Sequence, residues 1–379
     1  MKFIDSAWRA AALALAFASA AGPAGAQAQG VTKTSIVIGQ SIVLAGLGSS
    51  LARPYQEGAR LYFDRVNAAG GVNGRKLDVV TLDDNGRTVT TVANTKKLLE
   101  QGVLCLFGYY GSPQVTAAYP LIKGSDVLMF APMSAADEFR GPAFPNIFTL
   151  RPGYSDEAAA ITKHAATLGA RKLAIIHAGD PESLEALAAA EHAMTQLGAK
   201  LVAKAAASSS GNVANAVDSS LAAAPDSVLV IGDANGAAGV VRDLRAKGFR
   251  GPIYGFSNTG ESLLAEELGP EGAGVVVVRV VPKTDNPTSI VARELQADAT
   301  AAKAGKPNVY MLEGYIAARV LVEALRRIPG DPTRAKLKHA LESLHDVNVG
   351  SFRVDYSKGR VGSKLVELAL IDSQGRVRE

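Results

Sequence analysis

The fold is decided by residues 35–82, which read SIVIG at 35–39, YQEGARLYFDRVNAAGG at 55–71 and LDVVTL at 77–82. The first and last pieces are short apolar runs of the kind that form buried strands. The middle piece repeats its apolar residues at the spacing of one helix face, in Tyr55, Ala59, Tyr62 and Val66. Gly70-Gly71 follows, as glycine often does at a helix end. This order of strand, helix and strand predicts a parallel βαβ unit.

The same alternation continues and predicts an α/β fold with two successive doubly wound halves. A Pro- and Gly-containing stretch at 141–153 separates the halves. Further strands are predicted at 103–107, 127–130, 172–176, 201–203, 227–231, 252–254 and 275–281. Further helices are predicted at 89–100, 113–123, 158–168, 187–197, 213–223, 236–247, 288–303, 308–327 and 332–345. Residues 352–355 and 365–372 are expected to form a β-hairpin around Lys358-Gly359.

Length and composition indicate a globular protein of two domains. The chain has 379 residues, of which 47% are hydrophobic and 20% charged. Lys and Arg number 40 against 36 Asp and Glu, a formal charge of +4. No run of five or six basic residues occurs, so no nucleic-acid partner is expected.

The first 28 residues have the pattern of a signal peptide. Lys2 and Arg9 supply positive charge, and residues 10–21 form an apolar segment too short to span a membrane. Small residues then fit cleavage after Ala26 or after Ala28. No Cys follows that would carry a lipid anchor. A disordered Ala-rich tail is the alternative interpretation.

Motifs for catalysis, cofactors and metals are not found. Gly46-Leu47-Gly48 lacks a third glycine at the required spacing, where Leu51 stands. The Asp83-Asp84 pair is expected in a solvated loop, and the five His are dispersed. Cys105 is expected to be a buried structural thiol. The sequence therefore predicts no catalytic residue, no metal site and no cofactor.

Position in the fold points to a binding site instead. In doubly wound sheets, ligands bind beyond the carboxyl ends of the strands. Two such ends carry small polar loops, one with Tyr110, Gly111 and Ser112 and one with Met133, Ser134 and Ala135. Ser112 and Ser134 are candidates to bind an anion or, alternatively, to cap the helices that follow.

Six segments together resemble the periplasmic leucine/isoleucine/valine-binding proteins of ABC importers. They are GQS at 39–41, YQEGA at 55–59, VNAAGGVNGR at 66–75, TLDD at 81–84, LFGYYGS at 106–112 and FAPMS at 130–134. The resemblance implies the type I periplasmic-binding fold, in which two α/β lobes are joined by three crossovers. These would fall near 149–152, 278–282 and 346–351. Lobe one would comprise 31–149 plus 282–347, and lobe two 150–280 plus 350–379.

The resemblance also implies ligand-binding positions. Ser112 matches a serine that binds the ligand carboxylate, and Met133, Ser134 and Ala135 match a loop that holds carboxylate and amine. Three further positions depart from the family pattern. Glu182 and Ala234 stand where aromatic side chains are usual, and Ser257 stands where a carboxylate usually pairs with the ligand ammonium. A branched-chain amino acid is therefore not asserted as the ligand.

The expected function is that of a monomeric periplasmic binding protein. It would close around a small polar solute, such as an amino acid, an amide or a small organic acid, and deliver it to the membrane permease of an ABC transporter. A sensor of the same fold that feeds a signalling receptor is the alternative. An enzyme is the third hypothesis, and it lacks a visible nucleophile–base pair or metal cluster.

Overall fold

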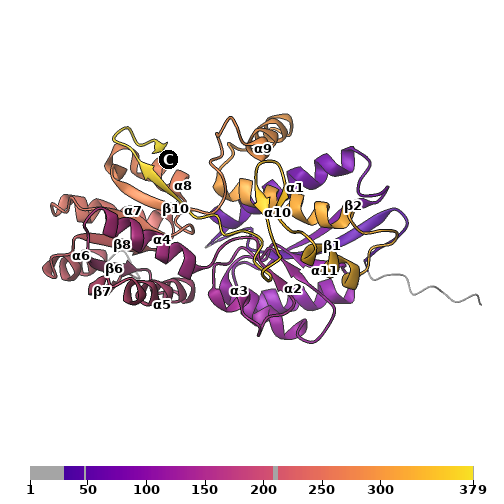
Figure 1. Cartoon of the computed structure of the whole chain (residues 1–379), viewed down its shortest axis with the longest axis horizontal. Coiled ribbons are helices and arrows are strands. Elements are labelled where there is room, and N and C mark those ends of the chain that lie inside the picture. The colour runs from indigo at the N-terminus through magenta and orange to yellow at the C-terminus, as the bar shows by residue number, and fades with distance from the viewer. Residues whose placement is uncertain (1–29, 47, 208–211, 379) are drawn as a thin grey trace, which may run out of the picture.

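A computed structural model describes residues 30–46, 48–207 and 212–378 of the protein. The predicted signal peptide lies outside these residues. Two α/β lobes lie side by side, each built on its own mainly parallel sheet (Figure 1). The predicted α/β class is thus confirmed, with the sheets in two lobes.

The first lobe holds a five-stranded parallel sheet in the order β2-β1-β3-β4-β5. Both of its faces are buried: Ile36 and Ile38 enter one apolar cluster, whereas Val37 packs against another. Its first elements are β1 (Ser35–Ile42), α1 (Ser49–Ala68), β2 (Lys76–Asp83), α2 (Thr88–Glu100), β3 (Cys105–Phe107), α3 (Ser112–Ala118), η1 (Tyr119–Leu121), β4 (Met129–Phe130), η2 (Asp137–Arg140) and β5 (Ile147–Phe148).

The second lobe holds a seven-stranded sheet in the order β14-β13-β10-β9-β8-β6-β7. Its strands are parallel except for β13 and β14, which pair antiparallel at one edge. Its elements are α4 (Tyr154–Thr167), β6 (Lys172–His177), α5 (Pro181–Gln196), β7 (Lys200–Ala206), α6 (Val213–Ala222), β8 (Ser227–Ile231), α7 (Ala234–Ala246), β9 (Ile253–Gly255), α8 (Glu261–Leu268), η3 (Gly269–Gly272), β10 (Val275–Arg279), β13 (Glu367–Ile371) and β14 (Val377–Arg378).

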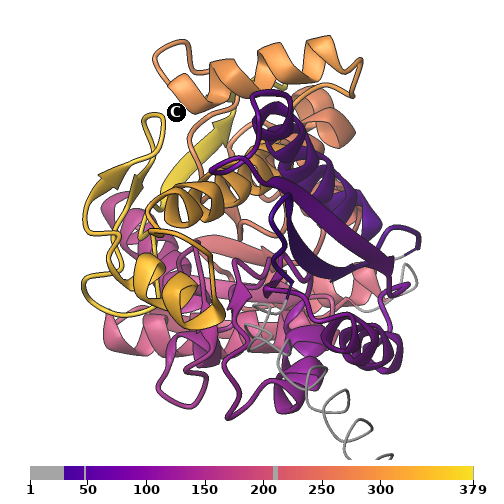
Figure 2. The ribbon, with the colours of Figure 1, turned by 90° about the vertical axis from the view of Figure 1, so that its right-hand side faces the viewer.

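The first lobe is completed by segments that follow the second lobe in sequence. These are α9 (Ile290–Ala301), α10 (Val309–Arg326), α11 (Arg334–Glu342), β11 (Val347–Asn348) and β12 (Arg353–Val354). Figures 1 and 2 show the orange and gold helices of this part beside the indigo α1. Helices α1 and α10 touch at backbone distance, because a Cβ on Gly58 would lie 1.8 Å from the Met311 carbonyl oxygen and one on Gly314 would lie 1.9 Å from that of Tyr55.

The chain changes lobe three times. Leu150 belongs to the first-lobe core and Tyr154 to the second; the reverse change lies between Val280 and Val281. The third change comes after Tyr356, which still packs in the first-lobe core. This is later than the predicted 346–351, because the apolar side chains at 349, 352, 354 and 356 all lie in that core. We propose the lobe limits expected from the sequence, except that the third crossover lies at 357–365.

The predicted hairpin around Lys358-Gly359 is wrong. Residues 353–354 pair instead with Val347–Asn348, through a turn in which Gly350 and Ser351 have positive φ angles of 80° and 73°. Strand β13 pairs with β10 of the other lobe. The two apolar runs fall on opposite sides of a crossover, so closeness in sequence did not make them partners.

Candidate functional site

A cleft of about 430 Å³ lies between the two lobes. Loops that follow β3 and β4 line it from the first lobe, and loops that follow β6, β8 and β9 line it from the second. All five are carboxyl ends of parallel strands, where doubly wound sheets bind ligands. Its volume is within the range of small-molecule sites.

The first-lobe wall of the cleft is formed by two loops tied to each other through their backbones. Tyr110 and Met133 form a parallel bridge, and the N–H of Met133 donates to the Tyr109 carbonyl at 2.7 Å. The hydroxyls of Ser112 and Ser134 share a buried hydrogen bond of 2.6 Å. This wall therefore offers aromatic, thioether and hydroxyl groups but no charge of its own.

Glu182 reaches this wall from the second lobe. It is the second residue of α5, and its Oε2 accepts the Ser112 N–H at 2.8 Å. Its Oε1 accepts the Tyr154 hydroxyl at 2.6 Å. Burial, followed by the charge and hydrogen bond of Glu182, raises the pKa of Tyr154 well above its ordinary value. One carboxylate therefore joins the two lobes across the cleft.

Two more carboxylates stand on the second-lobe wall at helix starts. Asp180 accepts the Ser183 N–H at 3.0 Å and caps α5, and Asp233 accepts the Gly236 N–H at 2.9 Å and caps α7. Capping explains why the sequence has Asp at both positions. It also leaves the second-lobe wall acidic.

The cation that lines the cleft, Arg151, is held in a buried ionic network. Its guanidinium lies 3.4 Å from a Glu157 oxygen and 3.5 Å from a Glu313 oxygen. Burial alone would lower the pKa of Arg151, but Glu313 and Glu157 outweigh it and raise that pKa. Burial raises the pKa of Glu157 and of Glu313, and Arg151 opposes it. Arg151 thus links α4 of the second lobe to α10 of the first, with its charge already balanced.

Ser257 takes part in this network rather than in the lining of the cleft. Its N–H and hydroxyl donate to Glu157 at 2.9 and 2.8 Å, and it accepts a hydrogen bond from Arg151. Glu157 thus supplies a carboxylate beside Ser257, but that carboxylate is engaged by Arg151. Ala234 lies in a neighbouring small pocket with Ser50.

The remaining predicted site residues lie in or directly behind the cleft. Tyr110, Gly111, Met133, Ser134, Ala135 and Glu182 line it. Ser112 is fully buried behind them. Sequence reasoning missed Arg151, Glu157 and Glu313. Arg151 lies in the Pro-containing stretch that separates the halves, which was the one signal pointing to a hinge residue.

The structure tests the predictions that were made for Asp84 and for Cys105. Asp84 is not in a solvated loop: it is 1% exposed and accepts hydrogen bonds from Ser41, Thr91 and Gly86. Burial raises its pKa. Cys105 is fully buried, and burial raises the pKa of its thiol to about 12, so the thiolate is strongly disfavoured.

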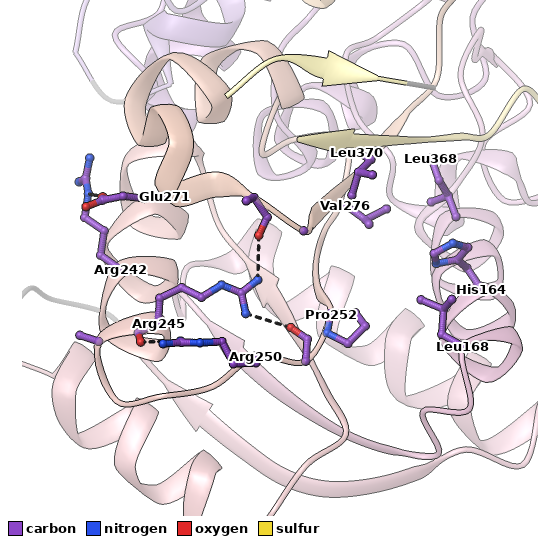
Figure 3. Close-up of a pocket in the computed structure, with 14 residues that line it drawn as sticks. His164, Leu168, Arg242, Arg245, Arg250, Pro252, Glu271, Val276, Leu368 and Leu370 are labelled. Carbon is purple, nitrogen blue, oxygen red and sulfur yellow. Dashed lines mark hydrogen bonds and ion pairs between the residues drawn. The ribbon is translucent and has the colours of Figure 1, made fainter. Parts of the chain in front are cut away.

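A larger cavity of about 910 Å³ lies in the second lobe alone (Figure 3). It is at the opposite ends of the strands, since Pro252 and Gly274 precede β9 and β10. Arg245 there donates to the carbonyls of 249, 251 and 273, and Arg242 pairs with Glu271. Its arginines are thus engaged in holding loops of their own lobe, and the interlobe cleft remains the candidate site.

The described part of the chain also bears on membrane spans and on metal sites. None of the helices in this part of the chain is both long and apolar enough to cross a bilayer. Within the same residues, no cluster of three or more His, Cys, Asp or Glu has the arrangement of a metal site.

Comparison with known proteins places the chain in a family. A family model described as periplasmic binding protein matches residues 35–367, and the chain belongs to this family. An amino acid binding protein of Pseudomonas aeruginosa PAO1 is 24% identical over 307 residues, which are 79% of this chain and 81% of that protein. The Leu/Ile/Val-binding protein of Escherichia coli K12 is 26% identical over 113 residues, 30% of this chain and 31% of that one.

A solved structure shares the whole fold. The crystal structure of an extracellular ligand-binding receptor from Verminephrobacter eiseniae matches with a TM-score of 0.85 and 26% identity, over 91% of this chain and 100% of that chain. The predicted resemblance to Leu/Ile/Val-binding proteins and the predicted type I periplasmic-binding fold are both confirmed.

Proposed function

We propose that the protein is the solute-binding component of an ABC importer, which holds a small polar solute between its lobes and passes it to a membrane permease. The observation that carries this proposal is the interlobe cleft, lined from both lobes by strand-end loops. The family assignment and the amino acid binding relative support the same function. Export to the periplasm, with cleavage after Ala26 or Ala28, and a monomeric state belong to the proposal.

The proposed mechanism is hinged closure. Solute binds one wall, and the second wall then completes its contacts, which shifts the population toward the closed form that a permease recognises. Micromolar affinity requires about 8 kcal/mol of binding free energy. A few hydrogen bonds within a largely buried cleft are enough to provide it.

The residues proposed to contact solute are those that line the cleft. On the first wall they are Tyr110, Gly111, Met133, Ser134 and Ala135, with Ser112 positioning Ser134 through their shared hydrogen bond. Glu182 is the second-wall residue. We propose Ser257 as a positioning residue for Glu157 and no contact for Ala234.

The test is a thermal-shift screen of the purified mature protein against amino acids, amides, amines and small organic acids. A binding solute is expected to raise the melting temperature and to decrease the radius of gyration in solution scattering as the lobes close. A screen without any stabilising solute, together with an unchanged radius, would contradict the proposed function. Co-purification with a membrane permease tests the transport step separately.

A further inference from the structure

We propose that Glu182 determines the specificity of the cleft: its carboxylate holds the Ser112 N–H and the Tyr154 hydroxyl, so that the site rejects carboxylate ligands and takes an organic cation such as an amine, amidine or guanidine. The inference rests on the proposed function, since it names the class of solute for the same cleft. It concerns a contact between the protein's own groups that spans the two lobes.

The Ser112 N–H and the Tyr154 hydroxyl already donate their hydrogen bonds to Glu182. Each oxygen of Glu182 accepts one hydrogen bond, at 2.8 Å from the Ser112 nitrogen and 2.6 Å from the Tyr154 oxygen. A solute carboxylate that bound the same two donors would have to displace Glu182. It would then lie next to the displaced Glu182 carboxylate, which has the same charge. Bonds to a charged carboxylate are among the stronger hydrogen bonds in proteins, so the displacement is unfavourable.

The residues that line the cleft carry a net negative charge. Among the described residues that line it, the acids are Asp180, Glu182 and Asp233, and the single base is Arg151. Glu157 and Glu313 pair with Arg151, so its charge does not offset the three acids. A positively charged solute is therefore the one whose charge complements this wall.

Tyr110 lines the cleft from the first wall and supplies an aromatic ring there. A Cβ on Gly48 would stand 2.7 Å from its ring, so the ring is packed against backbone on one side. Burial, and then Glu182, Asp233 and Asp180, raise the pKa of its hydroxyl. An aromatic ring on which acidic groups act in this way is a favourable neighbour for a cation.

Unpaired polar atoms agree with a solute that mainly donates hydrogen bonds. Asn258 lines the cleft, and its Oδ1 is buried without a donor. Arg151 Nε is likewise buried without an acceptor. A cation whose N–H groups face the acids and Asn258, and which offers one acceptor to Arg151, would satisfy both.

The decisive experiment uses acetate, so it does not depend on knowing the natural solute. Glu182→Ala vacates the position that the carboxylate occupies, and the variant is expected to bind acetate at least tenfold more tightly than the unaltered protein, measured by thermal shift. Acetate is also expected to close the variant's lobes in scattering. Glu191→Ala removes another glutamate of α5, one that holds neither donor and pairs with the exposed Lys204, and it should respond to acetate as the unaltered protein does.

Charge and occupancy are separated by Glu182→Gln, which keeps the shape of the side chain but loses the charge. Solutes that stabilise the unaltered protein should bind this variant at least fivefold more weakly, whereas Glu191→Gln should retain them. Equal acetate responses in Glu182→Ala and Glu191→Ala would overturn the inference.

The outcome of the solute screen distinguishes the two proposals. If the stabilising solutes are mainly organic acids, the cation preference is wrong while the binding function stands. If they are mainly cationic, both stand. If no solute binds and the lobes do not move, the function itself fails, whatever acetate does to Glu182→Ala.

Discussion

The two walls of the cleft are built in different ways. The first wall is uncharged, and its loops are fixed to each other by the bridge between Tyr110 and Met133 and by the serine pair behind it. The second wall carries Asp180, Glu182 and Asp233 at the starts of α5 and α7. The difference indicates that the first wall sets the shape of the cleft and the second wall sets its charge.

The acids of the second wall differ among themselves. Asp180 and Asp233 cap helices, so they are needed for the local fold whatever the ligand. Glu182 makes no capping bond to its own helix and instead crosses to the first wall, where it accepts the N–H of Ser112 at the start of α3. A change at Glu182 therefore tests the charge of the cleft and leaves the caps of α5 and α7 in place.

The largest expected effect comes from breaking the network that joins the two walls. Arg151→Leu would leave Glu157 and Glu313 buried, at 0% and 6% exposure, without their cation. Removing one partner of a buried ion pair typically costs about 3–5 kcal/mol. We expect a loss of that size in the free energy of unfolding, measured by denaturant titration.

Arg242→Leu is the matched control for Arg151→Leu. Its ion pairs with Glu267 and Glu271 are exposed, so little change in stability is expected. Equal effects of the two substitutions would show that the buried network is not what joins the lobes.

A smaller effect is expected from the hydroxyl pair of the first wall. Ser112→Ala should lower the free energy of unfolding by about 1 kcal/mol, because Ser134 loses a buried hydrogen bond. Ser134→Ala should act similarly, and the double variant should cost less than the sum of the two. Additive costs in this double-mutant cycle would mean that the two hydroxyls do not interact.

The smallest effect is expected from pH, through the charge of the second lobe. Burial, and then Glu182, Glu138 and Asp137, raise the pKa of Glu185 to about 7 from an ordinary 4.5. Glu138 and Asp137 belong to the first lobe, so opening the lobes should return this pKa toward its ordinary value. The closed form then binds protons more readily between the two values.

The sign of the pH effect follows from this difference. The carboxylate penalises closure fully above pH 7 and not at all below about pH 4.5, so acidification from pH 8 to 5 should favour the closed form. The radius of gyration should fall over this range, and Glu185→Gln should reduce the change. Burial also raises the pKa of Glu261 to about 7, so only the comparison of variants isolates Glu185. Identical pH curves for both proteins would refute its role.

Local sequence patterns predicted the elements well where each strand and helix forms its own periodic unit. Residues 55, 59, 62 and 66 are all buried on one face of α1, as their spacing required. The prediction of a hairpin near the C-terminus was wrong because strand pairing there depends on which lobe each strand joins. No local pattern around Lys358 records that choice.

Local sequence patterns predicted only part of the candidate site as well. Tyr110, Met133 and Ser134 were accessible to prediction because strand-end loops of a parallel sheet meet at one edge. The ionic network of Arg151 could not be predicted, because Glu157 and Glu313 lie 6 and 162 residues further along the chain. In sequence these carboxylates look like surface charges, and only the packing of α10 against the crossover buries them.

The backbone contact between α1 and α10 determines the order in which the molecule can be assembled. Helix α1 lies at residues 49–68, but the partner on which Gly58 rests comes only at 309–326. The five strands β6 to β10 of the other lobe are contiguous in the chain and pair with one another, and only the edge strands β13 and β14 join them from later in the chain. Because closing a long loop is entropically costly and slow, the central strands of the second lobe are expected to pair before the first lobe acquires its contact between α1 and α10.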